Sequence, residues 1–296
     1  MHFDRASRTA ILIARCLLLA RQDPKYRSLV PPGVEAPLTA LLASDSAWFN
    51  RAVKYRWMRK IFLTLERFLL PGIITHYLVR KSWIEDATRE AINRGTDQVV
   101  VIGAGYDTLA WRLRQELPRV GFFEMDHPAT QAAKTRSLPA SANLTCLPLN
   151  LATDSPVAVL TACPGFSMDR STLIIAEGLF MYFPETQVAS LLSELTRLTR
   201  RKTEILFTCM ELPASGPVAF PSAHGAVGWW MRRCNEPFQW GIAPAALPAF
   251  LQKRGLKITA LADHHELRTK ILVPLDLASL ALARGEFLCL STTFSP

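Results

Sequence analysis

Short apolar runs alternate with segments of helical periodicity over the last two thirds of the chain. Seven runs rich in β-branched and aromatic residues predict strands: Gln98–Ile102, Arg119–Met125, Leu144–Leu149, Ser171–Ala176, Glu204–Thr208, Leu256–Leu261 and Glu286–Phe294. Helical patterns lie between several of them, notably at Thr108–Leu117, Ala129–Ser137 and Glu185–Thr199. This alternation is typical of a parallel sheet covered by helices on both faces. We therefore expect an α/β fold with a mostly parallel, seven-stranded sheet.

The chain ahead of this alternation has a different pattern. Residues 1–95 show helical periodicity, punctuated by Pro31-Pro32-Gly33 and Pro71-Gly72, and predict a helical cap that leads into the core. Near the other end, a helix is expected at Pro244–Arg254, followed by Gly255 in the position that ends helices. No helix of clear period joins the last two strands, so we expect an antiparallel addition to the sheet edge.

The stretch at about 210–241 has many prolines and glycines and predicts an irregular insertion. Long connections in compact domains are often lids or binding loops, so we expect a lid there. No linker rich in glycine, serine or like charges divides the chain. We therefore expect a single domain over 1–296, with its core at 96–296.

Charge and apolar content exclude several classes of protein. The formal net charge is +9, but the basic residues are scattered and not interleaved with aromatic residues, so we expect no nucleic-acid partner. Ile11–Ala20 resembles the apolar part of a signal peptide, yet Arg15 interrupts it and no small-residue cleavage pattern follows. No stretch offers the roughly 20 uninterrupted apolar residues of a spanning helix, so we expect no membrane span.

The six cysteines form no CxxC pair and have no zinc-ligand spacing with any histidine. We therefore expect no metal site. Free thiols in apolar, strand-like stretches are typical of a reducing compartment, which favours a cytoplasmic protein.

The run Val99–Thr108 reads VVVIGAGYDT and carries the strongest local signal. An apolar strand enters a turn made of Gly103, Ala104 and Gly105, and a helix begins near Thr108. Glycines let the backbone turn sharply and approach a ligand closely, and the helix N-terminus offers free N–H groups. A purely structural strand-to-helix turn would look the same, because the third glycine of a full GxGxxG motif is missing.

The next strand places acidic residues where a nucleoside would need them. Glu124 and Asp126 follow the glycines at near the spacing of about 20 residues expected for a carboxylate that binds ribose hydroxyls. The two side chains face the same side of the strand, so spacing alone leaves both open. Both could instead be helix-capping acids ahead of Pro128.

Two later strands help to choose between dinucleotide and sulfonium cofactors. Asn150 follows the third strand, where an adenine edge would lie, and Glu177 follows the fourth, where an acid could face a methionine ammonium or a sulfonium. The pyrophosphate of NAD favours a full glycine-rich turn, whereas S-adenosylmethionine has no phosphate and tolerates the shorter GAGYD form.

Several segments, in this order, resemble the leucine carboxyl methyltransferase family, which includes bacterial polyketide O-methyltransferases. They are SRTAILIARCLLLARQDP, VRKSWIED, VVVIGAGYDTLAWRL, FFEMDHPATQAAK, LPLNLATDS, IIAEGLFMYFPE and NEPFQWGIAPAALPAFLQKRGLKI. The resemblance covers nearly the whole chain. It implies a Rossmann-like methyltransferase fold and an S-adenosylmethionine-dependent O-methyltransferase.

The resemblance also implies a cofactor site. Asp126 would hold the ribose and Asn150-Leu151 the adenine. Arg80 would meet the cofactor carboxylate through a charge-assisted hydrogen bond, although an ordinary ion pair with Glu85 or Asp86 would also account for it. The full set is Arg80, Gly103, Ala104, Gly105, Asp126, Asn150, Leu151 and Glu177. Family members usually carry Asp where this chain has Asn150, which still accepts a hydrogen bond through its carbonyl oxygen.

The methyl acceptor is expected to be a carboxylate or hydroxyl of a small molecule. A carboxylate needs no base, whereas a hydroxyl would be helped by one, for which Tyr182, His127 and His224 are weak candidates. Aromatic residues of the lid could line an apolar acceptor pocket or simply close the core, namely Trp229, Trp230 and Phe238, with Arg232 or Arg233 beside them. An NAD-dependent oxidoreductase and a non-catalytic S-adenosylmethionine-binding protein remain alternatives. The sequence predicts neither the catalytic residues nor the oligomeric state.

Overall fold

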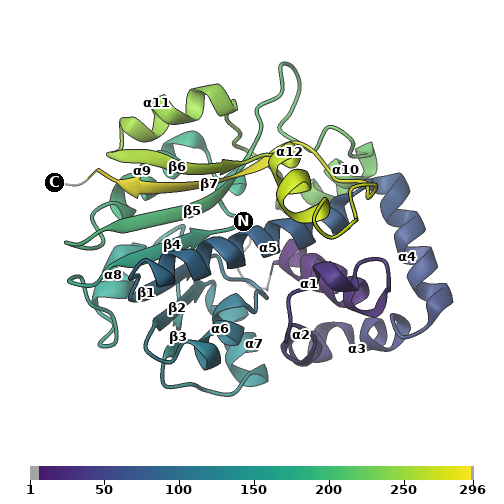
Figure 1. Ribbon diagram of the computed structural model, residues 1–296, viewed down its shortest axis with the longest axis horizontal. Helices are drawn as coiled ribbons and strands as arrows, with labels where there is room; N and C mark the ends of the chain where they lie inside the picture. Colours follow the sequence, from purple (N-terminus) through teal and green to yellow (C-terminus); the bar gives the residue numbers. More distant parts are fainter. Residues whose placement is uncertain (1–6, 295–296) are drawn as a thin grey trace.

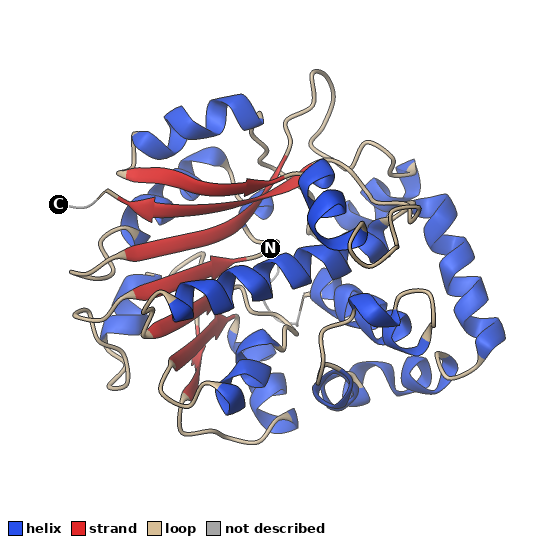
Figure 2. Ribbon diagram, in the orientation of Figure 1, coloured by secondary structure: helices blue, strands red, loops and turns tan. Residues whose placement is uncertain are grey.

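A computed structural model describes residues 7–294, so the first six residues of the expected cap lie outside the described residues. Its centre is a seven-stranded sheet with helices on both faces (Figure 2), which confirms the expected α/β class. The strands are β1 Gln98–Ile102, β2 Gly121–Asp126, β3 Leu144–Pro148, β4 Thr172–Ala176, β5 Thr203–Met210, β6 Leu256–Ala262 and β7 Glu286–Thr293.

The strand order is β3-β2-β1-β4-β5-β7-β6. The first five strands are parallel, and β7 pairs antiparallel with both β5 and β6. This confirms the expected antiparallel addition at the sheet edge, in which β7 lies next to β5 and β6 is outermost. Burial agrees with this order, because nearly all of β7 is buried, whereas exposed and partly buried residues alternate along β6 between its buried ends.

Alternating side chains of the strands feed two apolar cores. Val99 and Val101 point to the face covered by α5, Ile73–Asn93, and by α6, Leu109–Glu116. Their neighbours in β1 point to the opposite face, which is covered by α8, α9 and α11, at Pro156–Thr161, Glu185–Leu195 and Leu247–Gln252. α7, Pro128–Ser137, packs beside β2 and β3. Period-two burial on both faces is what a parallel sheet between helix layers requires.

Helices also make up the described part of the expected cap. They are α1 Arg8–Gln22, η1 Arg27–Leu29, α2 Glu35–Leu41, α3 Ala43–Ala52, α4 Arg56–Leu69 and α5. Figure 1 shows α5 crossing the sheet. It also shows α1, α2 and α3 beside one end of the sheet, with α4 as the outermost helix. Within residues 7–294, no single helix is long and apolar enough to cross a membrane, and only the pair α4 and α5, bent by 93°, passes by length and composition. The division of 1–296 into cap and core stays a prediction.

The expected irregular stretch at 210–241 contains a helix, α10, at Gly225–Arg233, so that expectation was wrong in part. His224 caps it by accepting a hydrogen bond from the N–H of Ala226 at 3.2 Å. α10 has no buried residue, and two of its nine residues are glycines, Gly225 and Gly228, which are poor helix formers and weaken the sequence signal for a helix.

The C-terminal helices are short. The expected helix at Pro244–Arg254 is a 3-10 turn, η3 Pro244–Ala246, continued by α11, and Gly255 follows with φ +73°. α12, His264–Leu267, and a π-helical turn, Arg268–Leu272, stand between β6 and β7.

Candidate functional site

A cavity lies where the parallel strands β1, β2 and β4 end, between the sheet and α1. Its walls come from α1, α5, the turns after those three strands, the segment around Phe238 and the first residue of β7. The cavity volume is about 190 Å³. A single water needs roughly 10–15 Å³ on this measure, so the space is large enough for an organic ligand. Open α/β sheets bind ligands at this edge.

The glycine turn forms the floor of the cavity. The N–H groups of Gly103 and Ala104 donate to the carbonyl of Met125 at 2.8 and 3.2 Å, so the turn is fixed on β2. Gly103 and Gly105 have φ of +70° and +49°, in the left-handed region that favours glycine. A Cβ on Gly103 would lie 2.8 Å from a methyl of Leu179, so the close approach also requires glycine.

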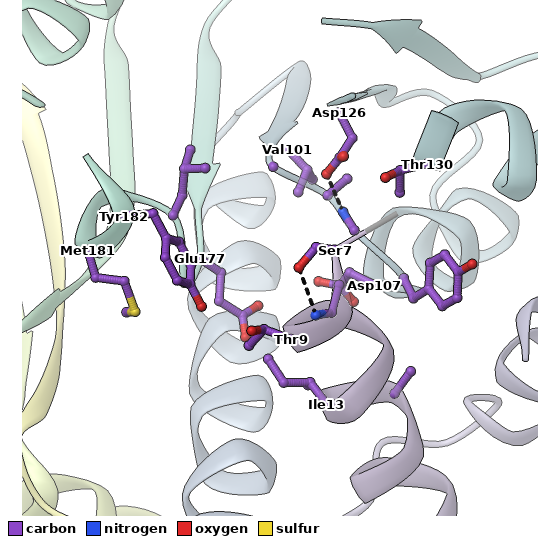
Figure 3. Close-up of a pocket in the computed structure, with 18 of the residues that line it drawn as sticks. Ser7, Thr9, Ile13, Val101, Asp107, Asp126, Thr130, Glu177, Met181 and Tyr182 are labelled. Carbon is purple, nitrogen blue, oxygen red and sulfur yellow. Dashed lines mark hydrogen bonds between the residues drawn. The ribbon is translucent and has the colours of Figure 1, made fainter. Parts of the chain in front are cut away.

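Asp126 ends β2 and faces the cavity (Figure 3). Its Oδ2 accepts a hydrogen bond from the N–H of Gly105 at 2.7 Å, and its Oδ1 accepts one from the N–H of His127 at 2.7 Å. Burial raises the pKa of this carboxyl, while these two bonds oppose the rise. The glycine turn and the acid are therefore one hydrogen-bonded unit.

Glu124, the other acid that spacing left open, has a different environment. It is fully buried, and its Oε2 lies 2.7 Å from the Nζ of Lys134 on α7. Burial raises the pKa of Glu124, and Lys134 opposes the rise. Because Glu124 does not line the cavity, Asp126 is the acid that a ligand can reach.

Arg80 and Glu177 meet in the wall opposite Asp126. The Nε of Arg80 donates to Oε1 of Glu177 at 2.8 Å, and its Nη1 donates to Glu286 at 2.8 Å. The Nζ of Lys81 lies 2.8 Å from Oε2 of Glu177 and 2.9 Å from Oδ2 of Asp107. Arg80 is therefore in a buried ionic network rather than in an ion pair with Glu85 or Asp86.

Glu286, the first residue of β7, is a functional candidate that the sequence analysis missed. Its side chain is 0% exposed, and it is held by Arg80, by His76 at 2.5 Å and by the hydroxyl of Thr208. Together, the guanidinium and these hydrogen bonds outweigh burial and lower the pKa of Glu286 to about 2. An acid that opens an otherwise apolar strand was the signal that could have found it.

The residues expected to hold an adenine are only partly brought to the cavity. Leu149 and Leu151 line it, whereas Asn150 does not. The Oδ1 of Asn150 instead accepts a hydrogen bond from the N–H of Ala152 at 3.1 Å, and the N–H of Asn150 donates to Asp154 at 2.8 Å. In this structure Asn150 shapes the turn from which Leu151 reaches the cavity.

The first turn of α1 closes one side of the cavity (Figure 3). The N–H groups of Arg8 and Thr9 donate to the Glu236 carboxylate at 3.1 and 3.0 Å, and so does the hydroxyl of Thr9. Tyr182 is half-buried beside them and hydrogen-bonds to Thr9, and desolvation holds its pKa well above the usual range. The chain Tyr182–Thr9–Glu236 joins the fourth strand's turn, α1 and the 210–241 stretch.

Of the other residues that the sequence analysis proposed, some line the cavity and some do not. Phe238 and His127 line the cavity, but Trp229, Trp230, Arg232 and Arg233 do not. His224 caps α10. Among residues 7–294, no group of three His, Cys, Asp or Glu side chains could hold a metal ion.

The cavity has a negative formal charge, although the chain as a whole has a positive one. Two cations line it, Arg80 and Lys81, against five carboxylates, Asp107, Asp126, Glu177, Glu236 and Glu286, so its formal net charge is −3. The chain carries +9. The cavity therefore favours a ligand with net positive charge.

A model of the leucine carboxyl methyltransferase family matches residues 27–196, more than half of the chain. A Mycolicibacterium gilvum protein, provisionally named an S-adenosyl-L-methionine-dependent methyltransferase, is 33% identical over 153 residues, which cover 50% of this chain and 58% of the relative. A Mycobacterium ulcerans protein with the same provisional name is 26% identical over 196 residues, covering 64% and 62%. The chain thus spans about 60% of the length of these curated relatives.

A solved structure from Thermobifida fusca, provisionally described as a methyltransferase, superposes with a TM-score of 0.60 at 12% identity. The superposition covers 99% of this chain and 97% of that one. The likeness is one of fold, and it confirms the Rossmann-like fold implied by the motifs.

Proposed function

Because the chain belongs to the leucine carboxyl methyltransferase family, we propose that it transfers a methyl group from S-adenosylmethionine to an oxygen of a small molecule. The acceptor oxygen belongs to a carboxylate or a hydroxyl. This chain matches only part of the length of the relatives named above. The proposed activity therefore rests on the cavity of this chain and not on those relatives.

The observation that carries the proposal is the negative cavity at the ends of β1, β2 and β4. In S-adenosylmethionine the amino-acid charges cancel and the sulfonium leaves a net charge of about +1, which the cavity charge of −3 attracts. The pyrophosphate of NAD would bring negative charge to the same wall, where like charges repel. The cavity charge thus supports a sulfonium cofactor over a dinucleotide.

The proposed contacts follow the residues around the cavity. The glycine turn lets a nucleoside approach the backbone, Asp126 accepts hydrogen bonds from ribose hydroxyls, and Leu151 packs on the adenine. Glu177 faces the ammonium and sulfonium side. Arg80 meets the ligand carboxylate with the edge of its guanidinium beside Gly178.

When bound, S-adenosylmethionine supplies an electrophilic methyl group. The protein's part is to hold the acceptor in line with it, and positioning of this kind contributes up to about 7–11 kcal/mol in favourable cases. A carboxylate acceptor is ionised at neutral pH and needs no base. For a hydroxyl acceptor, the base would be the Glu236 carboxylate, which accepts a hydrogen bond from the Thr9 hydroxyl beside Tyr182.

Calorimetry with S-adenosylmethionine, S-adenosylhomocysteine and NAD tests the cofactor. We expect both sulfur nucleosides to bind and NAD to give no measurable heat. Preferential binding of NAD would contradict the proposal and support the oxidoreductase alternative.

Transfer of a labelled methyl group to a panel of small carboxylic acids and phenols tests the reaction. Label in an ester or ether product is expected. Tight S-adenosylhomocysteine binding without turnover on any acceptor of the panel would support the non-catalytic alternative, which the cavity charge alone does not separate from an enzyme.

A further inference from the structure

The outermost helix, α4, presents an apolar stripe to solvent. Trp57, Ile61, Leu65 and Phe68 are 61%, 45%, 50% and 73% exposed, at spacings of four, four and three residues that place them on one face. None of the residues of α4 is buried. A stripe of four large apolar side chains on one helix face is a contact surface rather than scattered surface apolarity.

Basic residues border this stripe. Arg56, Lys60 and Arg67 are exposed and lie along one side of it by helical spacing. Trp48 on α3 and Tyr55 ahead of α4 are also exposed, at 52% and 59%. The outward surface of α4 therefore combines large apolar and aromatic groups with cations.

The inner side of α4 is fixed to the protein. The ring of Phe62 packs 5.1 Å from that of Phe49, and the Nη1 of Arg59 donates to the carbonyls of Val53 and Lys54 at 2.9 Å each. At the far end, the N–H of His224 donates to the carbonyl of Leu69 at 2.8 Å, which joins α4 to the start of α10. The helix is thus held in place at the outside of the molecule (Figure 1), and its stripe is exposed.

We propose that α4 docks this protein on an anionic lipid bilayer. Trp57, Ile61, Leu65 and Phe68 would enter the boundary between headgroups and acyl chains, while Arg56, Lys60 and Arg67 contact lipid phosphates. A fixed helix with a basic border, interfacial aromatic residues and a separate apolar stripe has the properties of an interfacial helix. It lies in the membrane plane and does not span.

Charge favours the bilayer over a second copy of this chain. Two α4 helices that packed stripe to stripe in antiparallel orientation would also bring their basic borders together, and like charges at a contact are unfavourable. An anionic surface turns the same border into an attraction. The inference is independent of the proposed methyl transfer, since none of these side chains lines the cavity.

Co-sedimentation with vesicles of phosphatidylcholine, with and without phosphatidylserine, tests the docking. We expect the whole protein to sediment with the anionic vesicles only. Arg56→Gln, Lys60→Gln and Arg67→Gln should each weaken this binding roughly fivefold. The double change Trp57→Ser with Phe68→Ser should weaken it by on the order of tenfold or more through lost apolar burial.

A matched triple variant controls for total charge. Arg197→Gln with Arg201→Gln and Lys253→Gln removes three exposed cations away from α4, and it should leave vesicle binding unchanged within twofold. All substituted side chains are exposed, so thermal unfolding should report intact folds.

Three results would overturn the proposal. One is no binding to anionic vesicles. Another is an equal loss of binding in the control triple variant and in a variant that combines Arg56→Gln, Lys60→Gln and Arg67→Gln. The third is a concentration-dependent dimer, seen by analytical ultracentrifugation, that the Trp57→Ser and Phe68→Ser changes abolish, because it would make the stripe a self-contact.

Discussion

Asp126 accepts hydrogen bonds from two backbone N–H groups, yet a carboxylate offers about four lone-pair sites. The free capacity faces the cavity. We expect Asp126→Ala to weaken S-adenosylhomocysteine binding by about 1–3 kcal/mol, as for the loss of a buried hydrogen-bond partner. Calorimetry measures it, with the exposed Asp169→Ala as control. Unchanged affinity in a folded Asp126→Ala variant would remove this residue from the site.

Glu286 makes stability depend on pH. Its pKa falls from 4.5 to about 2 in the folded protein, so its charge stabilises the fold at pH values above about 4.5. That contribution, on the order of 3 kcal/mol, is lost as the pH falls from about 4.5 towards 2.

Denaturant unfolding of Glu286→Gln tests this dependence. The variant should be less stable than the natural protein at pH 7, and the difference should shrink in acid. Exposed Glu211→Gln should show no such difference at either pH. A gap for Glu286→Gln that stays constant from pH 7 to pH 3 would contradict the argument.

At the scale of elements, Gly72 sets the 93° bend between α4 and α5. It has φ +81°, and a Cβ there would lie 2.7 Å from the backbone of Ala281 and Leu282. We expect Gly72→Ala to lower the free energy of unfolding by roughly 3 kcal/mol or more, since left-handed strain of about 1–2 kcal/mol adds to a clash with backbone.

Gly95→Ala is the matched control for this change. Gly95 also has positive φ, +99°, but nothing lies within 4 Å of its Cβ position. It should therefore cost only the strain of roughly 1–2 kcal/mol. Equal losses at Gly72 and Gly95, measured by chemical denaturation, would mean that the bend relaxes around a methyl group.

The elements that the sequence predicted well are those whose apolar pattern is dictated by burial on both sides. The run Gln98–Ile102 coincides with β1, because all five of its residues are buried. α10 was missed, since its glycines, Gly225 and Gly228, weaken the sequence signal for a helix. The position of β7 inside the sheet depends on contacts across many residues, which no local pattern encodes.

In the candidate site, too, local features could be predicted from the sequence and long-range contacts could not. Gly103, Gly105 and Asp126 were predictable, because turn chemistry and strand ends are local. The contact of Glu286 with Arg80 and that of Thr9 with Glu236 were not predictable, since each joins segments more than 200 residues apart. The roles of all these residues toward a ligand stay predictions.

At the scale of the whole molecule, the six free cysteines differ in burial, and burial determines which of their thiols can react. Burial raises the pKa of Cys16 to about 12, of Cys146 to about 11 and of Cys289 to about 12, and it holds that of Cys209 well above the usual value. Only a thiolate reacts readily. These four should stay protonated at neutral pH.

Iodoacetamide labelling followed by peptide mass spectrometry tests this order. Cys163 and Cys234 should react first, and Cys16 and Cys146, which are also partly exposed, should react more slowly because their pKa is raised. A second group, the buried Cys209 and Cys289, should react only as the protein unfolds. Addition of a bound nucleoside should slow the second group further, because a ligand that binds only the folded state suppresses unfolding. Labelling of Cys209 as fast as Cys234 in folded protein would contradict the expectation.

The placement of β7 between β5 and β6 affects how the protein is made. β5 is synthesised well before its partner, and at roughly 5–20 residues per second the ribosome needs about 4–15 s to pass from Met210 to Glu286. During that interval the nascent chain exposes the bare edge of β5, and β6 has no strand to pair with. Until β7 is made, the unpaired edge of β5 can pair with other chains, and the cavity still lacks the Glu286 carboxylate. We therefore expect the nascent chain to need protection by chaperones during this interval.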